Sequence, residues 1–181
     1  MPVIYLNAAH THRSPGGVWG GVTEHGECLR LCNALKSTLN MLAPRLEVRV
    51  TEGNFIFPPV KNGDMLLIFH KGINEMKENK HGAGILVKSD ADAAYQYRAF
   101  RLLTALCGDS LRYRGVHTAT DGSPFGFFVN TPAREAYLIT AGYIESERDT
   151  EAVNQGLRAI ALRLSQEIIK IYKEKANEDN T

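Results

Sequence analysis

The sequence lacks the features that would place it outside the ordinary globular proteins. Three cysteines in 181 residues are too few for a framework of disulfide bonds. No apolar run approaches the ~20 residues that a membrane-spanning helix needs, so we expect no membrane partner. The formal net charge is only +1. Because dedicated nucleic-acid binders carry a clear basic excess, we expect no nucleic-acid partner either. The composition leaves the oligomeric state open.

The first residues also lack the pattern of a secretory signal peptide. The stretch MPVIYLNAAHTHRSPGG has neither a basic start nor a long apolar segment after it. We therefore expect the protein to be synthesised in the cytoplasm without a signal peptide.

The length and composition instead indicate one globular domain. Hydrophobic residues make up 44% of the chain and charged residues 23%, so a substantial core can form. We place this domain at residues 1–172. Residues 173–181, with the sequence KEKANEDNT, form a polar C-terminal tail that we expect to be frayed or disordered.

The apolar pattern predicts strands that alternate with helices. Short apolar runs predict the strands, and longer segments with apolar residues at helical spacing predict the helices. We expect Asp149 or Thr150 to cap the last helix, which includes Val153 to Ile171. Such alternation implies an α/β fold: a single domain with a mostly parallel twisted sheet flanked by helices. The expected strands are residues 3–7, 46–50, 65–70, 84–88, 125–129 and 136–140, and the other expected helices are residues 23–42 and 90–107.

Two histidines and a glutamate are candidate metal ligands. His10 comes three residues after the first expected strand, and His70 ends the apolar run MLLIFH. Ligand sites in open α/β sheets lie beyond the carboxyl ends of the strands. Glu24 lies in the first turn of the next helix, whose start can lie near those strand ends. Two imidazoles and a carboxylate suit zinc and leave its fourth position for a water that can attack an amide.

The same residues also have a plainer interpretation. His70 can be a core histidine with a satisfied hydrogen bond, and Glu24 a first-turn carboxylate that the helix dipole favours. The loop SPGGVWGG lacks the glycine spacing of a dinucleotide-binding fingerprint. We expect it to line the cleft, with Trp19 available to stack on a sugar or a peptide. Three arginines can meet a substrate carboxylate or simply face solvent, namely Arg112, Arg114 and Arg134.

Four segments of the chain occur in an informative order. They are VIYLNAAHTH, then GG followed by TEHGECLRLCNALKSTL, then DMLLIFHKGIN, and finally AYLITAGYIESERDTEAV. In order, spacing and local context these segments resemble the zinc-dependent N-acetylmuramoyl-L-alanine amidases of the Amidase_3 type, over about residues 2–172. The resemblance implies a phosphorylase/hydrolase-like α/β fold, a bare catalytic domain, and Zn²⁺ bound by His10, Glu24 and His70.

The resemblance also implies an activity. It implies hydrolysis of the amide between the lactyl group of N-acetylmuramic acid and L-alanine, so the partner would be peptidoglycan. The lack of a signal peptide suits a bacteriophage lysin that acts on the cell wall after release. A zinc hydrolase that acts on a different amide is an alternative.

One position departs from the family pattern. The family carries a glutamate at the end of the penultimate strand, where this chain has Thr140. That glutamate serves as general base and acid, whereas a threonine hydroxyl has no useful pKa for either task, although it can orient a water. Glu145, five residues on, can reach back from the loop, and His117 or His12 are other candidate proton acceptors. Alternatively, the chain is a catalytically weak or inactive peptidoglycan-binding relative of the same fold.

Overall fold

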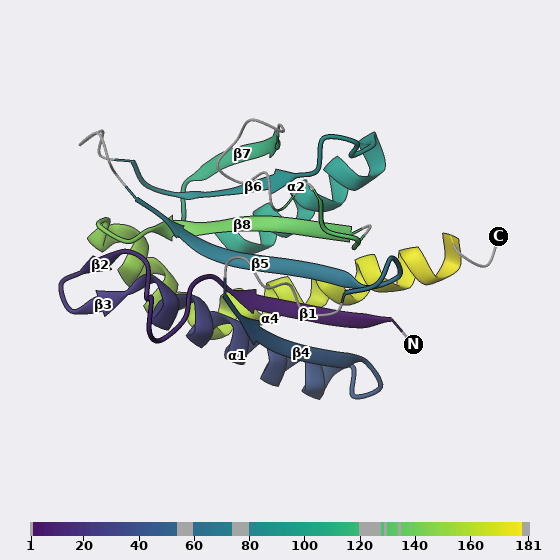
Figure 1. Ribbon diagram of the computed structural model, residues 1–181, viewed down its shortest axis with the longest axis horizontal. Coiled ribbons are helices and arrows are strands. Elements are labelled where there is room, and N and C mark those ends of the chain that lie inside the picture. The colour runs from purple at the N-terminus through teal and green to yellow at the C-terminus, as the bar shows by residue number, and fades with distance from the viewer. Residues whose placement is uncertain are drawn as a thin grey trace.

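A six-stranded twisted sheet forms the centre of the molecule in the computed structural model (Figure 1). The structure describes residues 2–53, 60–73, 80–119, 128, 130–133 and 135–178, with side chains up to Lys175. The strand order is β4-β1-β5-β8-β6-β7. In that order the strands are β4 (Glu47–Glu52), β1 (Val3–Ala8), β5 (Met65–Gly72), β8 (Glu135–Tyr143), β6 (Ala83–Val87) and β7 (Tyr113–Thr118).

Most of the sheet is parallel. β4, β1, β5 and β8 run in one direction, β6 runs antiparallel to β8, and the edge strand β7 is parallel to β6. β1 and the first part of β5 are apolar without alternation because both of their faces are covered. The prediction of a single α/β domain with a mostly parallel sheet is confirmed.

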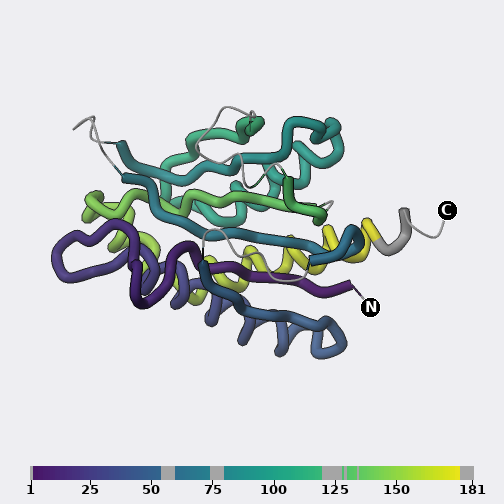
Figure 2. The backbone as a smooth tube through the Cα atoms, viewed as in Figure 1, coloured from purple at the N-terminus to yellow at the C-terminus, as the bar shows by residue number. Residues whose placement is uncertain are grey.

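The helices of the described part of the chain cover one face of the sheet. They are α1 (Glu24–Leu42), α2 (Ala93–Cys107) and α4 (Glu147–Glu178), and Figure 2 shows all three running behind the sheet. Leu6 and Leu67 share a buried cluster with Leu31 of α1. Tyr5 and Leu66, which alternate with them, belong to a second buried cluster on the other face. Within the described ranges, no helix combines the length and the hydropathy needed to cross a membrane.

Local capping sets where the first two long helices begin. The Thr23 side chain accepts a hydrogen bond of 3.1 Å from the Gly26 N–H, which places the start of α1 where the sequence predicts it. The Asp92 carboxylate accepts a 2.7 Å bond from the Tyr95 N–H. α2 therefore begins at Ala93 rather than at residue 90.

The start of α4 differs from the prediction. The Ser146 hydroxyl accepts a 3.2 Å hydrogen bond from the Asp149 N–H, so Ser146 takes the capping role that we expected of Asp149 or Thr150. The Asp149 carboxylate is buried and instead accepts N–H bonds from Gly82 at 2.7 Å and Tyr143 at 2.9 Å. The Asp149 carboxylate therefore makes tertiary contacts instead of capping its own helix.

The end of α4 differs too, because the helix continues past the point at which we expected a frayed tail. Glu174 forms an ion pair of 2.8 Å with Arg101 of α2, and the Lys175 ammonium lies 3.8 Å from the Glu135 carboxylate of β8. These contacts hold the last turns against the body of the protein. The expectation of disorder is wrong for the part of this segment that the structure describes.

The sequence pattern did not predict the strands β2 (Val18–Trp19), β3 (Val22–Thr23) and β7. β2 and β3 form a hairpin inside the glycine-rich loop. β7 is missed because four of its six residues are exposed and it shows no apolar run. The expected strand at residues 125–129 lies outside the described residues except for Phe128, which is buried.

Candidate functional site

The three candidate metal ligands gather at the carboxyl ends of the parallel strands. His10 follows the end of β1, His70 lies near the end of β5, and Glu24 is the first residue of α1. The Ala9 N–H bonds to the Phe69 carbonyl at 2.9 Å, so the chain after β1 stays beside β5 as it leaves the sheet. This is the edge at which open α/β sheets place their ligand sites.

The Glu24 carboxylate is buried and held by backbone groups. Its side chain is 2% exposed, and its Oε2 lies 3.1 Å from Nε2 of His10. Oε2 also accepts the Gly17 N–H at 3.1 Å, and Oε1 accepts the Lys71 N–H at 3.0 Å. Because the two backbone donors lie on different segments, they hold the carboxylate in one orientation toward His10.

The loop before α1 wraps closely around this pair. Gly16 has φ +73°, and a Cβ built on it would lie 2.5 Å from Oε2 of Glu24 and 2.6 Å from Nε2 of His10. His10 itself has φ 65°, and it is the one non-glycine residue with positive φ in the described part of the chain. Strained backbone of this kind concentrates at functional sites. The glycine and the left-handed histidine together allow the close packing.

His70 is oriented by hydrogen bonds at both ring nitrogens. Nδ1 lies 3.2 Å from the Lys71 carbonyl, which can only accept, so Nδ1 carries the proton and donates. The neutral ring then has a lone pair at Nε2, which accepts the Thr140 hydroxyl at 2.8 Å. Burial lowers the pKa of His70, and the Glu24 charge partly opposes this change. A neutral ring with one unprotonated nitrogen is the form that binds a metal.

The chemistry of the three side chains fits zinc. Two donors on a tetrahedral zinc, each about 2.0–2.1 Å from it, are separated by roughly 3.3 Å. His10 Nε2 and Glu24 Oε2 are 3.1 Å apart, which is close to this value. No group of three or more His, Cys, Asp or Glu in the described ranges is already gathered around one metal position. A metal shared by all three requires His70 to exchange its contact with Thr140 for the metal.

Lys71 brings a buried amine next to the site but on the other side of the sheet. Its side chain is 2% exposed, and among the described residues its Nζ has no hydrogen-bond partner. Burial lowers its pKa, while Cys28 and Glu27 of α1 act in the opposite direction. The backbone of Lys71 contacts Glu24 and His70, whereas its side chain faces the helices.

The candidate proton acceptors lie in different places. Thr140 is the register partner of His70 across β5 and β8. Glu145 is half-buried in the turn between β8 and α4, and the N–H of the preceding Ile144 bonds to the Gly72 carbonyl at 3.0 Å. Glu145 therefore lies at the same edge of the sheet as Thr140.

Two other histidines named from the sequence, His12 and His117, are exposed. His12 is exposed in the turn closed by the bridge between Thr11 and Ser14. His117 is exposed on β7, and its Nε2 lies 3.1 Å from the Arg114 carbonyl. Of the two, His117 shares a cavity with Thr140.

This cavity, of about 220 Å³, opens beside the candidate ligands on β6, β7 and β8. Sequence reasoning identified Thr140 and His117 but missed Gly84 and Tyr143 of its wall, because they become neighbours of these residues only through the pairing of β6 with β7 and β8. Arg114, one of three arginines considered from the sequence, also lies in its wall, while Arg134 lies outside the described residues. The described residues that line it are Gly84, Ile85, Leu86, Arg114, His117, Thr140 and Tyr143.

The hairpin in the glycine-rich loop presents the single tryptophan to solvent. Gly20 and Gly21 both have positive φ, as a two-residue hairpin turn requires. Trp19 is 52% exposed and Val18 57%. The Glu24 N–H bonds to the Gly17 carbonyl at 2.8 Å, so the base of the hairpin is held at the start of α1, beside the candidate ligand Glu24.

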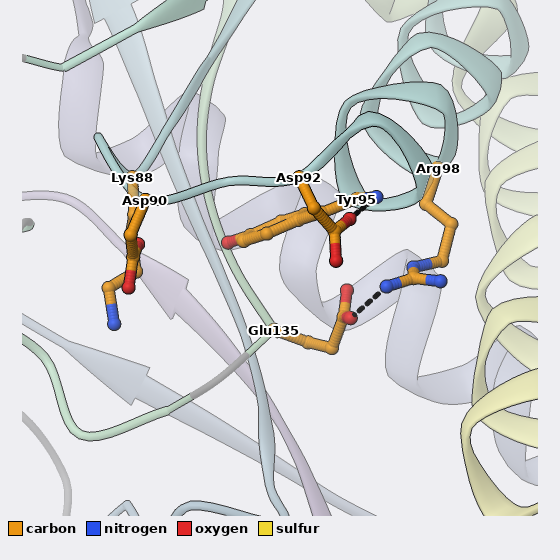
Figure 3. A pocket seen from close by; sticks show the side chains of 6 residues that line it. All are labelled: Lys88, Asp90, Asp92, Tyr95, Arg98 and Glu135. Carbon is orange, nitrogen blue, oxygen red and sulfur yellow. Dashed lines mark hydrogen bonds and ion pairs between the residues drawn. The ribbon is translucent and has the colours of Figure 1, made fainter. Parts of the chain in front are cut away.

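A second polar cavity, of about 140 Å³, lies at the opposite end of β8 (Figure 3). Its wall contains the buried ion pair between Arg98 and Glu135, 2.7 Å apart. Figure 3 shows the Tyr95 ring reaching across from α2 above the Glu135 side chain. Glu135 also accepts a hydrogen bond from the Tyr137 hydroxyl. Glu135 thus joins α2 to β8 through contacts with its neighbours, so we assign these groups to stability.

Comparison with known sequences identifies no relative. No protein-family model matches the chain, and no curated protein matches it.

Comparison with solved structures identifies the fold. The N-acetylmuramoyl-L-alanine amidase AmiC2 of Nostoc punctiforme matches with a TM-score of 0.72 and 14% identity, over 95% of this chain and 97% of that one. The catalytic domain of CwlV, an N-acetylmuramoyl-L-alanine amidase from Bacillus (Paenibacillus) polymyxa var. colistinus, matches with a TM-score of 0.71 and 16% identity, over 96% and 99%. The catalytic domain of the CD27L endolysin targeting Clostridia difficile matches with a TM-score of 0.68 and 16% identity, over 94% and 98%. The chain therefore has the fold of N-acetylmuramoyl-L-alanine amidase catalytic domains.

Proposed function

We propose that the protein is a zinc-dependent amidase that hydrolyses the bond between the lactyl group of N-acetylmuramic acid and L-alanine in peptidoglycan. The observation that supports it most is the backbone-held Glu24 carboxylate, 3.1 Å from His10 and beside His70 at the strand ends. This geometry occurs on a fold shared with solved amidases of this bond. The same arrangement suits hydrolysis of other amides, so the identity of the bond rests on the likeness of the fold.

His10, Glu24 and His70 would hold the zinc in this proposal. Zinc bound there would supply an acidified water and a Lewis acid for the amide carbonyl. Glu24 contributes a charged oxygen whose direction the Gly17 and Lys71 amides set. His70 contributes the lone pair of Nε2, because its Nδ1 donates to the Lys71 carbonyl.

The proton transfers require a further group. Thr140 stands next to His70 and can orient a water or the substrate through its hydroxyl, but it cannot accept a proton near neutral pH. We propose Glu145, at the same edge of the sheet, as the general base. A positioned base is worth about 10²–10⁴-fold in rate, so a zinc amidase without one would be slow rather than inactive.

We further propose that the enzyme acts as a lysin on the cell wall after release from the cytoplasm. A solved neighbour of this fold is an endolysin catalytic domain, which suits a bacteriophage origin. Thr140 favours a second candidate function, a peptidoglycan-binding relative with weak or no catalysis.

Metal analysis combined with dye release from purified cell walls tests the proposal. We expect one zinc per chain, dye release that a chelator abolishes, and recovery on adding zinc. Glu24→Gln should lose the metal, because a neutral amide replaces the charged ligand. Glu151→Gln is the matched control, because it makes the same change at an exposed glutamate of α4.

The outcomes separate the candidates. Stoichiometric zinc without release from any wall type would favour the binding module. Absence of stoichiometric zinc would overturn the amidase proposal. Release of dye that no chelator affects would contradict the role of the metal.

A further inference from the structure

One row of residues crosses four neighbouring strands of the sheet beside the proposed metal site. His70 of β5 pairs with Thr140 of β8, and Thr140 pairs with Gly84 of β6. A Cβ built on Gly84 would lie 3.7 Å from the Cβ of Arg114 on β7. Paired residues of adjacent strands project to the same face. The row therefore leads from the proposed metal ligand to a cation at the edge of the sheet.

The glycine in this row leaves a hollow. Gly84 has no side chain between the flanking Thr140 and Arg114, and the cavity of about 220 Å³ lies there. Gly84 has ordinary negative φ, and a Cβ on it would make only van der Waals contacts of 3.5 Å or more. The backbone conformation at position 84 therefore allows any residue. A side chain there would, however, fill the floor of the cavity.

Arg114 is the cation of this cavity, and an aromatic ring holds it in place. Its guanidinium lies over the Tyr143 ring, 5.4 Å from the centroid, and its Nη1 donates a 3.4 Å bond to the His81 carbonyl. The Tyr143 ring in turn lies against Gly72, where a Cβ would not fit. Among the described residues Arg114 has no ion pair with a carboxylate.

The charge of the lining selects an anion. His117 is a second basic side chain of the wall, and none of the described residues that line it is acidic. A guanidinium presents paired donors that match a carboxylate or a phosphate.

The spacing of the row fits a peptide. Neighbouring strands lie about 4.8 Å apart, so the three spacings from His70 to Arg114 amount to about 14 Å at the backbone. An extended peptide advances roughly 3.3 Å per residue, and a glutamate side chain and the long Arg114 side chain both add reach. A carboxylate about two residues from the scissile amide can therefore meet Arg114, which favours a carboxylate of a peptide over a phosphate.

We propose that the cavity between β6, β7 and β8 is a subsite for a carboxylate on the peptide side of the scissile amide, and that Arg114 binds this carboxylate. This inference rests on the proposed function for the identity of the scissile bond. Arg114 is thereby a specificity-determining residue, and Gly84 keeps the path to it open.

Paired probes that differ only in one carboxylate test the subsite. The binding probes are L-alanyl-glutamate α-amide and L-alanyl-glutamine α-amide, titrated calorimetrically into the zinc-loaded protein. The kinetic probes are the same dipeptides joined to N-acetylmuramic acid. For Arg114→Gln we expect Kd and KM for the glutamate probes to rise about tenfold or more, because a charge-assisted bond is lost, with kcat within about twofold. The glutamine probes should be unaffected.

Two further variants sharpen the result. Arg158→Gln is the matched control, because Arg158 is an exposed arginine on α4 that is absent from the cavity wall, and it should change no constant. Gly84→Val fills the cavity floor and should weaken binding of both probes while circular dichroism stays unchanged.

The outcomes distinguish the subsite from the proposed function. Equal binding of the two probes by the unmodified protein, or an equal effect of Arg114→Gln on both, would overturn the subsite even if hydrolysis is intact. Selective binding that Arg114→Gln abolishes would support the subsite even if the protein hydrolyses neither muramoyl probe, in which case the proposed function fails alone.

Discussion

The Thr140 hydroxyl donates a hydrogen bond of 2.8 Å to Nε2 of His70. The bond occupies the lone pair that we expect a metal to use, since Nδ1 of the same ring donates to the Lys71 carbonyl. Thr140 therefore stands in competition with the proposed zinc. Thr140 is also the residue that departs from the family pattern. Substitutions at position 140 therefore test both its effect on zinc binding and the lack of a general base there.

Thr140→Val should tighten zinc binding. Valine has nearly the same shape but removes the donor, and a hydrogen bond of this kind is worth about 0.5–1.5 kcal/mol. We expect zinc affinity to rise about three- to tenfold, measured by competition with a chromophoric chelator. Thr118→Val, at an exposed threonine of β7, serves as control. Unchanged or weaker zinc binding in Thr140→Val would show that the hydroxyl does not compete.

Thr140→Glu and Glu145→Gln identify the general base. A carboxylate at position 140 can accept the proton that threonine cannot, so Thr140→Glu should raise kcat by up to about 10²-fold. If Glu145 is the base of the unmodified protein, Glu145→Gln should lower kcat by about 10²–10⁴-fold with zinc still bound. Glu147→Gln, at an exposed glutamate two residues on, should leave kcat unchanged. An unaltered rate in Glu145→Gln would exclude Glu145 from this role.

Gly16→Ala should disrupt the site through a direct clash. The new methyl group would lie 2.5 Å from the Glu24 carboxylate. Gly21→Ala is a close control, because Gly21 also has positive φ, at +81° against +73°, but has nothing within 4 Å. Backbone strain should lower the unfolding free energy of both variants by about 1–2 kcal/mol, and the clash should lower that of Gly16→Ala further. Only Gly16→Ala should lose zinc affinity; equal losses in the two variants would count against the packing argument.

Arg98→Met should destabilise the protein strongly. Arg98 and Glu135 are both buried and 2.7 Å apart, so removing one partner leaves a buried charge. We expect a loss of about 3–5 kcal/mol in urea unfolding. The double variant with Glu135→Met should recover much of this loss, because it removes both charges. Arg49→Met breaks an exposed pair with Glu47 and should have no measurable effect.

Local patterns of apolar residues predicted the central strands and the long helices. The apolar runs VIYL in β1 and MLLIF in β5 predict central strands, and the helical spacing of apolar residues in α1 predicts one buried face. Strand ends also pointed to His10 and His70, because the direction of a parallel sheet gathers those ends at one edge. These predictions depend on neighbouring residues alone.

Long-range contacts decided the features that the sequence could not show. Asp149 reads as a helix cap from its position, yet it binds the backbone of Gly82, 67 residues away. β7 is polar enough to pass for a loop and becomes a strand because β6 offers it a partner.

The sequence by itself determined the α/β class and which side chains carry the candidate chemistry. Only the tertiary structure decided that Thr140 bonds to His70 and that Gly84 and Arg114 extend the same row, because strand order and register set which residues become neighbours.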